Sequence, residues 1–218
     1  MKKIIHTLNK RKYEAYLLSL FILLFGQIFL PNGFEALWQH LLVIQNVLLG
    51  LFLFKGAKRW LFTLAVILSL VLISECLLLF WLNDNATIRF SMGVVFSIYF
   101  IMASAKVYKD VLMAEKIGHE MIAAVFSGFI MLGFIGSFIF TLIELTNSGS
   151  FSNLGEGEVR FQNLSYFSFV SLLTIGYGDI VPLTQVAKKT AMLLGLFGNF
   201  YLTFVIAIVI GKFMKQKA

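Results

Sequence analysis

The hexapeptide Thr174-Ile175-Gly176-Tyr177-Gly178-Asp179 decides the fold. It follows an apolar stretch, residues 163–173, that is too short to cross a membrane, and Pro182 comes shortly after it. Longer apolar runs lie on both sides, at residues 121–145 and 186–213. Irregular backbone at membrane depth is tolerated only where protein or a water-filled pore surrounds it. We therefore predict a re-entrant loop, in which a short helix is followed by a strand that ends at the proline.

The composition is that of a protein embedded in lipid. Of the 218 residues, 59% are hydrophobic and only 13% are charged, and the mean hydropathy is +0.88. A soluble domain carries about 25% charged residues. The net charge of +7 comes from short basic clusters between apolar runs, which is typical of membrane topology signals and not of nucleic-acid binding. The sequence predicts an all-α integral membrane protein with no nucleic-acid partner.

Six apolar segments approach the roughly 20 residues that a helix needs to cross a bilayer. They cover residues 13–30, 38–54, 60–82, 88–107, 121–145 and 186–213. The first two are short and are interrupted by Gln27, Gln45 and Asn46. We therefore expect six transmembrane helices, with the re-entrant loop between the fifth and the sixth. The predicted division is a four-helix membrane domain at residues 1–118 and a second domain at residues 119–218.

The distribution of Lys and Arg predicts the orientation. Fourteen of the 18 basic residues fall on one side of the six predicted spans: Lys2, Lys3, Lys10, Arg11, Lys12, Lys55, Lys58, Arg59, Lys106, Lys109, Lys116, Lys212, Lys215 and Lys217. Because positive loops stay inside, both termini are expected in the cytoplasm and the re-entrant loop on the outer face of the cell (inner) membrane. Lys188 and Lys189 run against this pattern, unless they lie at the outer mouth where the sixth helix begins.

The hexapeptide meets the backbone requirements of a narrow cation path. Carbonyl oxygens can replace the water shell of an ion without the strong hold of a full charge. Successive carbonyls point the same way only if the backbone alternates between ordinary and positive φ, which glycine adopts without steric cost. Gly176 and Gly178 stand at alternate positions, and Thr174 adds a hydroxyl oxygen. The preceding helix would also direct its C-terminal end, with roughly half a negative elementary charge, toward the cation.

Residues 166–182, which read YFSFVSLLTIGYGDIVP, resemble the pore sequence of the potassium channel family, particularly the small bacterial ion-channel proteins with a two-helix pore domain. The resemblance extends over residues 121–213. It implies a selectivity filter in which carbonyls bind K⁺, the mechanism known for that family. The implied ion-binding residues are Thr174, Ile175, Gly176, Tyr177 and Gly178. Asp179 would anchor the outer end of the strand from behind.

The chain departs from the family pattern at two positions near the filter. Leu173 stands where many members carry a second Thr, and Val170 stands where some members carry a Glu. Both changes alter the bracing around the filter. They leave open the alternative of a channel that is weakly selective among monovalent cations.

Three residues outside the filter have predicted roles, and the resemblance implies those of Glu144 and Gly198. Glu144 resembles a carboxylate that steadies the outer pore, although a solvated residue at the membrane interface is the alternative. Gly198 falls where the family has a hinge glycine in its inner helix, although close helix packing also explains a glycine there. Asn199 is expected to face a water-filled cavity, because an amide that faces lipid costs free energy. One filter per chain implies four chains, most simply a homotetramer.

The predicted fourth helix lacks the charges of a voltage sensor. Voltage sensing needs several basic residues along this helix, yet between Arg89 and Lys106 the sequence has no charged side chain. Glu75, in the third predicted span, is either a functional ionisable group or the partner of Arg89 at the start of the next helix. The sequence therefore argues against gating by a charged sensor.

The predicted function is a K⁺-selective channel subunit that conducts K⁺ passively across the bilayer. A second alternative is a non-conducting partner subunit of another channel. A potassium transporter fits less well, because that design places four degenerate filters in one chain. The sequence shows no nucleophile–base pair, phosphate loop or metal cluster, so we expect no enzyme activity and no cofactor. The gate is predicted either at the inner-helix crossing near residues 206–210 or in the filter.

Overall fold

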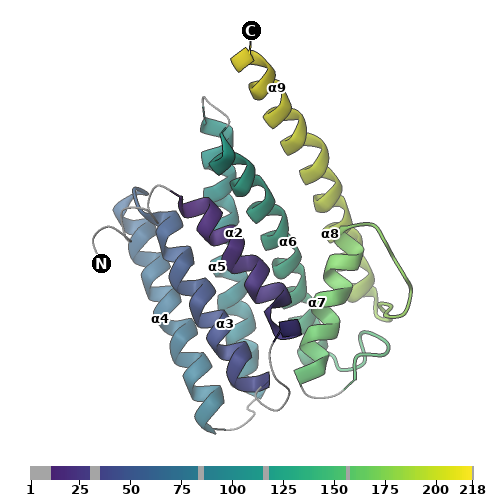
Figure 1. The fold of residues 1–218 in the computed structure, drawn as a ribbon. Coiled ribbons are helices and arrows are strands. Elements are labelled where there is room, and N and C mark those ends of the chain that lie inside the picture. Colours follow the sequence, from purple (N-terminus) through teal and green to yellow (C-terminus); the bar gives the residue numbers. More distant parts are fainter. Residues whose placement is uncertain (1–10, 30–34, 83–85, 115–117, 156–157, 218) are drawn as a thin grey trace.

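In a computed structural model, the described residues are 11–29, 35–82, 86–114, 118–155 and 158–217, and they form helices joined by short connections. The first four helices are α2 (Lys12–Phe25), α3 (Glu35–Gly50), α4 (Arg59–Leu82) and α5 (Ala86–Met113). Short 3₁₀ turns, η1 (Gly26–Phe29) and η2 (Leu51–Phe54), extend α2 and α3. These helices lie side by side on one side of the molecule (Figure 1).

The remaining helices are α6 (His119–Thr146), α7 (Glu158–Leu172), α8 (Gln185–Phe200) and α9 (Ile206–Lys217). A π-helical segment, η3 (Tyr201–Val205), joins α8 to α9, so that the last three elements form one continuous helix, here called the inner helix. Figure 1 shows α6 between the first four helices on one side and α7 and the inner helix on the other. The structure therefore has the short helix and the strand-like segment between two long helices that the sequence predicts.

Five helices in the described part of the chain are long and apolar enough to cross a membrane: Lys12–Phe29, Arg59–Leu79, Thr87–Met113, His119–Thr146 and Gln185–Lys215. Five of the six predicted spans are thus found. The predicted span at residues 38–54 is shorter than a span requires, because its apolar helix is only His40–Phe54. Asn46 interrupts the apolar character of this helix, and its amide is buried and donates to Ser19 Oγ at 2.9 Å. This helix is therefore held by a polar contact inside the bundle.

Aromatic side chains fill the interface between α5 and α6. The ring centroids of Phe96 and Phe138 are 4.7 Å apart, and those of Phe100 and Phe134 are 5.5 Å apart. Burying large aromatic side chains contributes strongly to packing energy, and offset ring pairs add about 0.5–1.5 kcal/mol each. Helices α5 and α2 both contact α6, so the first four helices pack directly on the C-terminal part of their own chain.

Two glycines bring α7 close to α6. A Cβ on Gly133 would lie 2.4 Å from the Phe169 ring, and one on Gly136 would lie 2.3 Å from Ser168 Oγ. The Ser168 hydroxyl uses this proximity to donate to the Gly133 carbonyl at 2.7 Å. Gln162 of α7 also donates to Gln27 Oε1 of η1 at 3.0 Å. These contacts set the position of α7, and hence of the strand that follows it.

Candidate functional site

The chain leaves α7 by a tight turn into the hexapeptide. The helix begins at Glu158, five residues before the predicted start, and ends at Leu172. The backbone N–H groups of Thr174 and Ile175 still bond back to Ser171 and Val170, at 3.1 and 3.0 Å. These two bonds hold the start of the hexapeptide on the end of α7, where the C-terminal carbonyls of the helix are directed toward it.

The backbone of the hexapeptide alternates in sign of φ. Thr174, Gly176 and Gly178 have φ of +57°, +61° and +79°. In the rest of the described chain, Asn153 is the other non-glycine residue with positive φ. A β-branched residue rarely adopts this conformation, and such strain is concentrated at functional sites. Thr174 thus adds a third residue of positive φ, two positions before Gly176. The sequence predicted positive φ only at the two glycines.

The hexapeptide is uncovered in the single chain. Residues 173–179 are all exposed, and Tyr177 is 71% exposed. Val170, behind this strand at the end of α7, is buried, whereas Leu173 is exposed. At membrane depth an open strand needs partners for its backbone groups. In the single chain, the hexapeptide is thus an exposed segment of irregular backbone.

Glu144 is buried at the end of α6, with 4% of its surface exposed. Its two carboxylate oxygens accept backbone N–H bonds from Gly149 at 2.8 Å and Ser150 at 2.9 Å. The burial disagrees with the alternative of a solvated interface residue. The contacts are with the loop before α7 and not with the hexapeptide, so the predicted support of the outer pore by Glu144 would have to pass through this loop.

The loop before α7 pairs with the chain that leaves the hexapeptide. The backbone N–H of Ser152 donates to Val181 O at 3.0 Å, and the N–H of Val181 donates to Ser152 Oγ at 2.9 Å. Asn153 Nδ2 donates to the Asp179 carbonyl at 2.7 Å. The Asp179 carboxylate also lies close enough to the Tyr166 phenol to interact with it electrostatically. Sequence reasoning identified Asp179 but missed Ser152 and Asn153, which belong to a polar loop without a recognisable motif.

Gly198 of α8 is buried against the end of α7. A Cβ on Gly198 would lie 2.7 Å from Leu172 Cδ1 and 2.9 Å from the Leu172 carbonyl oxygen. This contact favours the close-packing alternative, while the hinge role stays a prediction. Asn199, the next residue, is exposed in the single chain, and its predicted position at a water-filled cavity also stays a prediction.

Gly198→Ala is expected to lower the thermal stability of the purified protein, because the added methyl group would overlap the Leu172 carbonyl at the end of α7. Overpacking of this kind costs about 1–3 kcal/mol. Gly195→Ala is the matched control, since its Cβ would meet no heavy atom of the chain within 4 Å. The measurement is the unfolding midpoint of both variants in detergent. Equal midpoints, with altered channel opening only in Gly198→Ala, would support the hinge instead.

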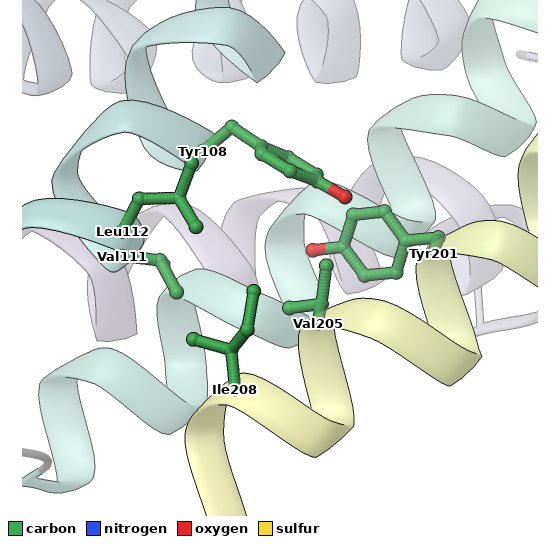
Figure 2. Close-up of a pocket in the computed structure, with 6 residues that line it drawn as sticks. All are labelled: Tyr108, Val111, Leu112, Tyr201, Val205 and Ile208. Atoms are coloured by element: carbon green, nitrogen blue, oxygen red, sulfur yellow. The ribbon is translucent and has the colours of Figure 1, made fainter. Parts of the chain in front are cut away.

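The inner helix is joined to the rest of the chain beyond Gly198, at the π-helical segment η3. The Tyr201 hydroxyl donates to the Val125 carbonyl at 2.6 Å, and its ring lies 5.4 Å from that of Tyr108. Figure 2 shows these two rings beside a small pocket of about 10 Å³, which is also lined by Val111, Leu112, Val205 and Ile208. Segments of π-helix in long helices are frequent at functional sites.

A second connection lies near the end of the inner helix. Lys212 Nζ donates to the carbonyls of Val111, Leu112 and Ala114, at 3.1, 2.6 and 2.8 Å. These carbonyls belong to the C-terminal end of α5, which carries a partial negative charge and favours a cation. Tyr201 and Lys212 therefore tie the inner helix to α6 and α5 on both sides of residues 206–210, where one of the two predicted gates lies.

Glu75 has a partner on the neighbouring helix. The Ser91 hydroxyl of α5 donates to Glu75 Oε1 at 2.7 Å, and Glu75 is 8% exposed. The sequence did not identify Ser91, because a serine in a long apolar helix gives no positional signal. The contact joins α4 to α5, which is a structural role.

A comparison with protein-family models matches residues 128–215 to a family described as ion channel. The comparisons with curated proteins and with solved structures gave no significant match. The matched segment contains most of α6 together with α7, the hexapeptide and most of the inner helix. The matched family is one of ion channels and not of enzymes, and the five candidate spans make the chain a multi-pass membrane protein. Residues 128–215 are therefore similar to the ion channel family over the part of the chain that holds α7, the hexapeptide and the inner helix.

Proposed function

We propose that the chain is one subunit of a K⁺-selective channel, which conducts K⁺ passively through a pore that four chains form. The observation that carries this proposal is the alternation of φ at Thr174, Gly176 and Gly178 inside the segment that matches the ion channel family. Such a backbone can turn successive carbonyls toward one axis, where they replace the water shell of K⁺. In this function Thr174–Tyr177 supply the carbonyls, and Gly178 and Asp179 hold the outer end of the strand.

Exposure of the hexapeptide supports assembly of several chains. A ring of carbonyls needs four copies of a single strand, and residues 173–179 are uncovered in one chain. A homotetramer with fourfold symmetry is the simplest arrangement that closes the ring. It would also cover backbone groups that lipid cannot satisfy. The partners in this function are K⁺, the lipid bilayer and three further copies of the chain.

Opening of this channel is expected not to depend on a charged voltage sensor. α5 carries no charged residue between Arg89 and Lys106, and Lys106 is engaged by Asp110 at the end of the helix. Moving one elementary charge across the membrane is worth about 2.3 kcal/mol per 100 mV, so a helix without charges gains little from a voltage change. Both termini are proposed to lie in the cytoplasm, because 14 of the 18 basic residues fall on that side of the predicted spans.

Bi-ionic reversal potentials of the purified chain in planar bilayers test the proposal. A K⁺-selective channel is expected to give a reversal potential close to that for K⁺ alone, with a current that Ba²⁺ blocks. A reversal potential near zero in K⁺ and Na⁺ would favour the weakly selective alternative, for which Leu173 and Val170 are the candidate causes. No current in the purified chain, together with co-assembly with another channel subunit, would favour the non-conducting partner.

A further inference from the structure

A short segment of the loop before α7, residues 150–154, lies along the chain that leaves the filter and is here called the strap. Backbone bonds join the two segments, since the N–H of Leu183 donates to Ser150 O at 2.8 Å and the N–H of Ser152 donates to Val181 O at 3.0 Å. Phe151 and Pro182 face each other in an isolated antiparallel bridge. The strap thus follows the outer exit of the filter over several residues.

The strap is itself attached to both helices of the pore domain that precede the filter. The Phe151 ring is buried, with centroids 5.3 Å from Phe140 of α6 and 5.5 Å from Phe167 of α7. Asn163 Nδ2 of α7 donates to the carbonyl of Leu154 at 2.9 Å. The carboxylate of Glu144 holds the N–H of Ser150 at 2.9 Å. A group carried by the strap therefore has a defined position relative to α7.

The side-chain amide of Asn153, in the strap, binds the outer end of the hexapeptide. Asn153 has a φ of +54°, and its Nδ2 donates to the Asp179 carbonyl at 2.7 Å. This carbonyl belongs to the first peptide group after Asp179, directly beyond the alternating residues. A hydrogen bond to it fixes the plane of that peptide. Asn tolerates positive φ better than other non-glycine residues, so the position suits this side chain.

We propose that Asn153 is a positioning residue of the filter, which holds its outer end in the ion-binding conformation. The proposal rests on the proposed function. Without this hydrogen bond, the Asp179 carbonyl loses a direct restraint while Val181 stays bonded to Ser152, and the carbonyls of the preceding residues lose their common direction more often. K⁺ binds only the ordered strand, so a less ordered strand needs more K⁺ to reach the same occupancy. A less ordered strand also discriminates less well between K⁺ and Na⁺.

The test compares Asn153→Gly with Ser148→Gly in the full-length purified chain. Glycine keeps the positive φ at position 153 and removes only the amide, so the backbone of the strap is preserved. Ser148 is an exposed residue of the same loop and provides the control. The first readout is the K⁺ concentration that gives half of the maximal increase in unfolding temperature. The second readout is the Na⁺ to K⁺ permeability ratio from bi-ionic potentials.

Asn153→Gly is expected to raise the half-maximal K⁺ concentration about fivefold and the permeability ratio by a similar factor, which corresponds to one hydrogen bond. Ser148→Gly is expected to match the wild type. Asn153→Asp, which replaces the donor by an acceptor of equal size, should change both readouts in the same direction. If either variant at position 153 lowers the unfolding temperature equally at all K⁺ concentrations, with both readouts unchanged or reduced, Asn153 is merely structural and the proposal is wrong. If the wild type shows neither K⁺ stabilisation nor K⁺ current, the proposed function fails instead.

Discussion

Gly176→Ala is expected to abolish K⁺ flux through the reconstituted channel. Gly176 has a φ of +61°, and an L-residue with a side chain loses roughly 1–2 kcal/mol in this conformation. In a tetramer, four alanine residues would strain the same ring of carbonyls. We therefore expect position 176 to lose its positive φ, and the carbonyls there to lose their common direction. We expect the flux of K⁺ from loaded liposomes to fall at least about a hundredfold, on the order of the combined strain.

Gly118→Ala is the control for this experiment. Gly118 lies before α6 with extended backbone, at φ of −114°, and its Cβ would meet no heavy atom within 4 Å. The substitution should leave flux and its block by Ba²⁺ unchanged. An undiminished flux in Gly176→Ala that Ba²⁺ does not block would contradict the assignment of residues 174–179 as the filter.

Glu144→Ala should cause the second large effect, a loss of about 2–4 kcal/mol in the free energy of unfolding of each chain. The variant leaves the buried N–H of Ser150 without its acceptor, and it also removes the carboxylate oxygen that accepts from the N–H of Gly149. Glu144→Gln retains one oxygen and is expected to lose roughly half as much. The measurement is unfolding of the purified protein by denaturant, followed by the stability of the assembled channel in detergent.

Glu14→Ala serves as the comparison for the Glu144 variants. The Glu14 carboxylate pairs with Arg11 at 3.7 Å near the surface, where 38% of its side chain is exposed, and such pairs contribute about 0–1 kcal/mol. A Glu144→Ala protein that is as stable as Glu14→Ala would show that the loop before α7 does not depend on the buried carboxylate. In that case the proposed support of the outer pore by Glu144 would be wrong.

The long helices of the pore domain could be predicted well from apolar runs bounded by polar residues. The predicted segment 121–145 corresponds to α6 (His119–Thr146), and the predicted segment 186–213 corresponds to the inner helix that starts at Gln185. Both runs are long enough for bilayer thickness alone to define them. The second predicted span failed this criterion, because its apolar helix is shorter and carries a buried Asn46 that is satisfied by another helix.

Gly198 illustrates why a glycine in a helix is ambiguous in sequence. Flexibility and close packing both favour glycine, and the two differ only in what lies beside the missing Cβ. In the structure that neighbour is Leu172, whose carbonyl oxygen would lie 2.9 Å from the added atom. The packing partner comes from a different helix, so no local pattern could have named it.

The hexapeptide at residues 174–179 determined by itself that the chain has a segment of alternating φ, because the spacing of Gly176 and Gly178 dictates where positive φ is inexpensive. The apolar composition likewise determined that the solvent is lipid. Only the tertiary structure showed the positive φ of Thr174 and decided what supports this strand: the carboxylate of Glu144 on the loop before α7, and the amide of Asn153 on the Asp179 carbonyl. These contacts join residues that are far from the strand in sequence, and the donors and acceptors meet only when α6, α7 and the inner helix have packed.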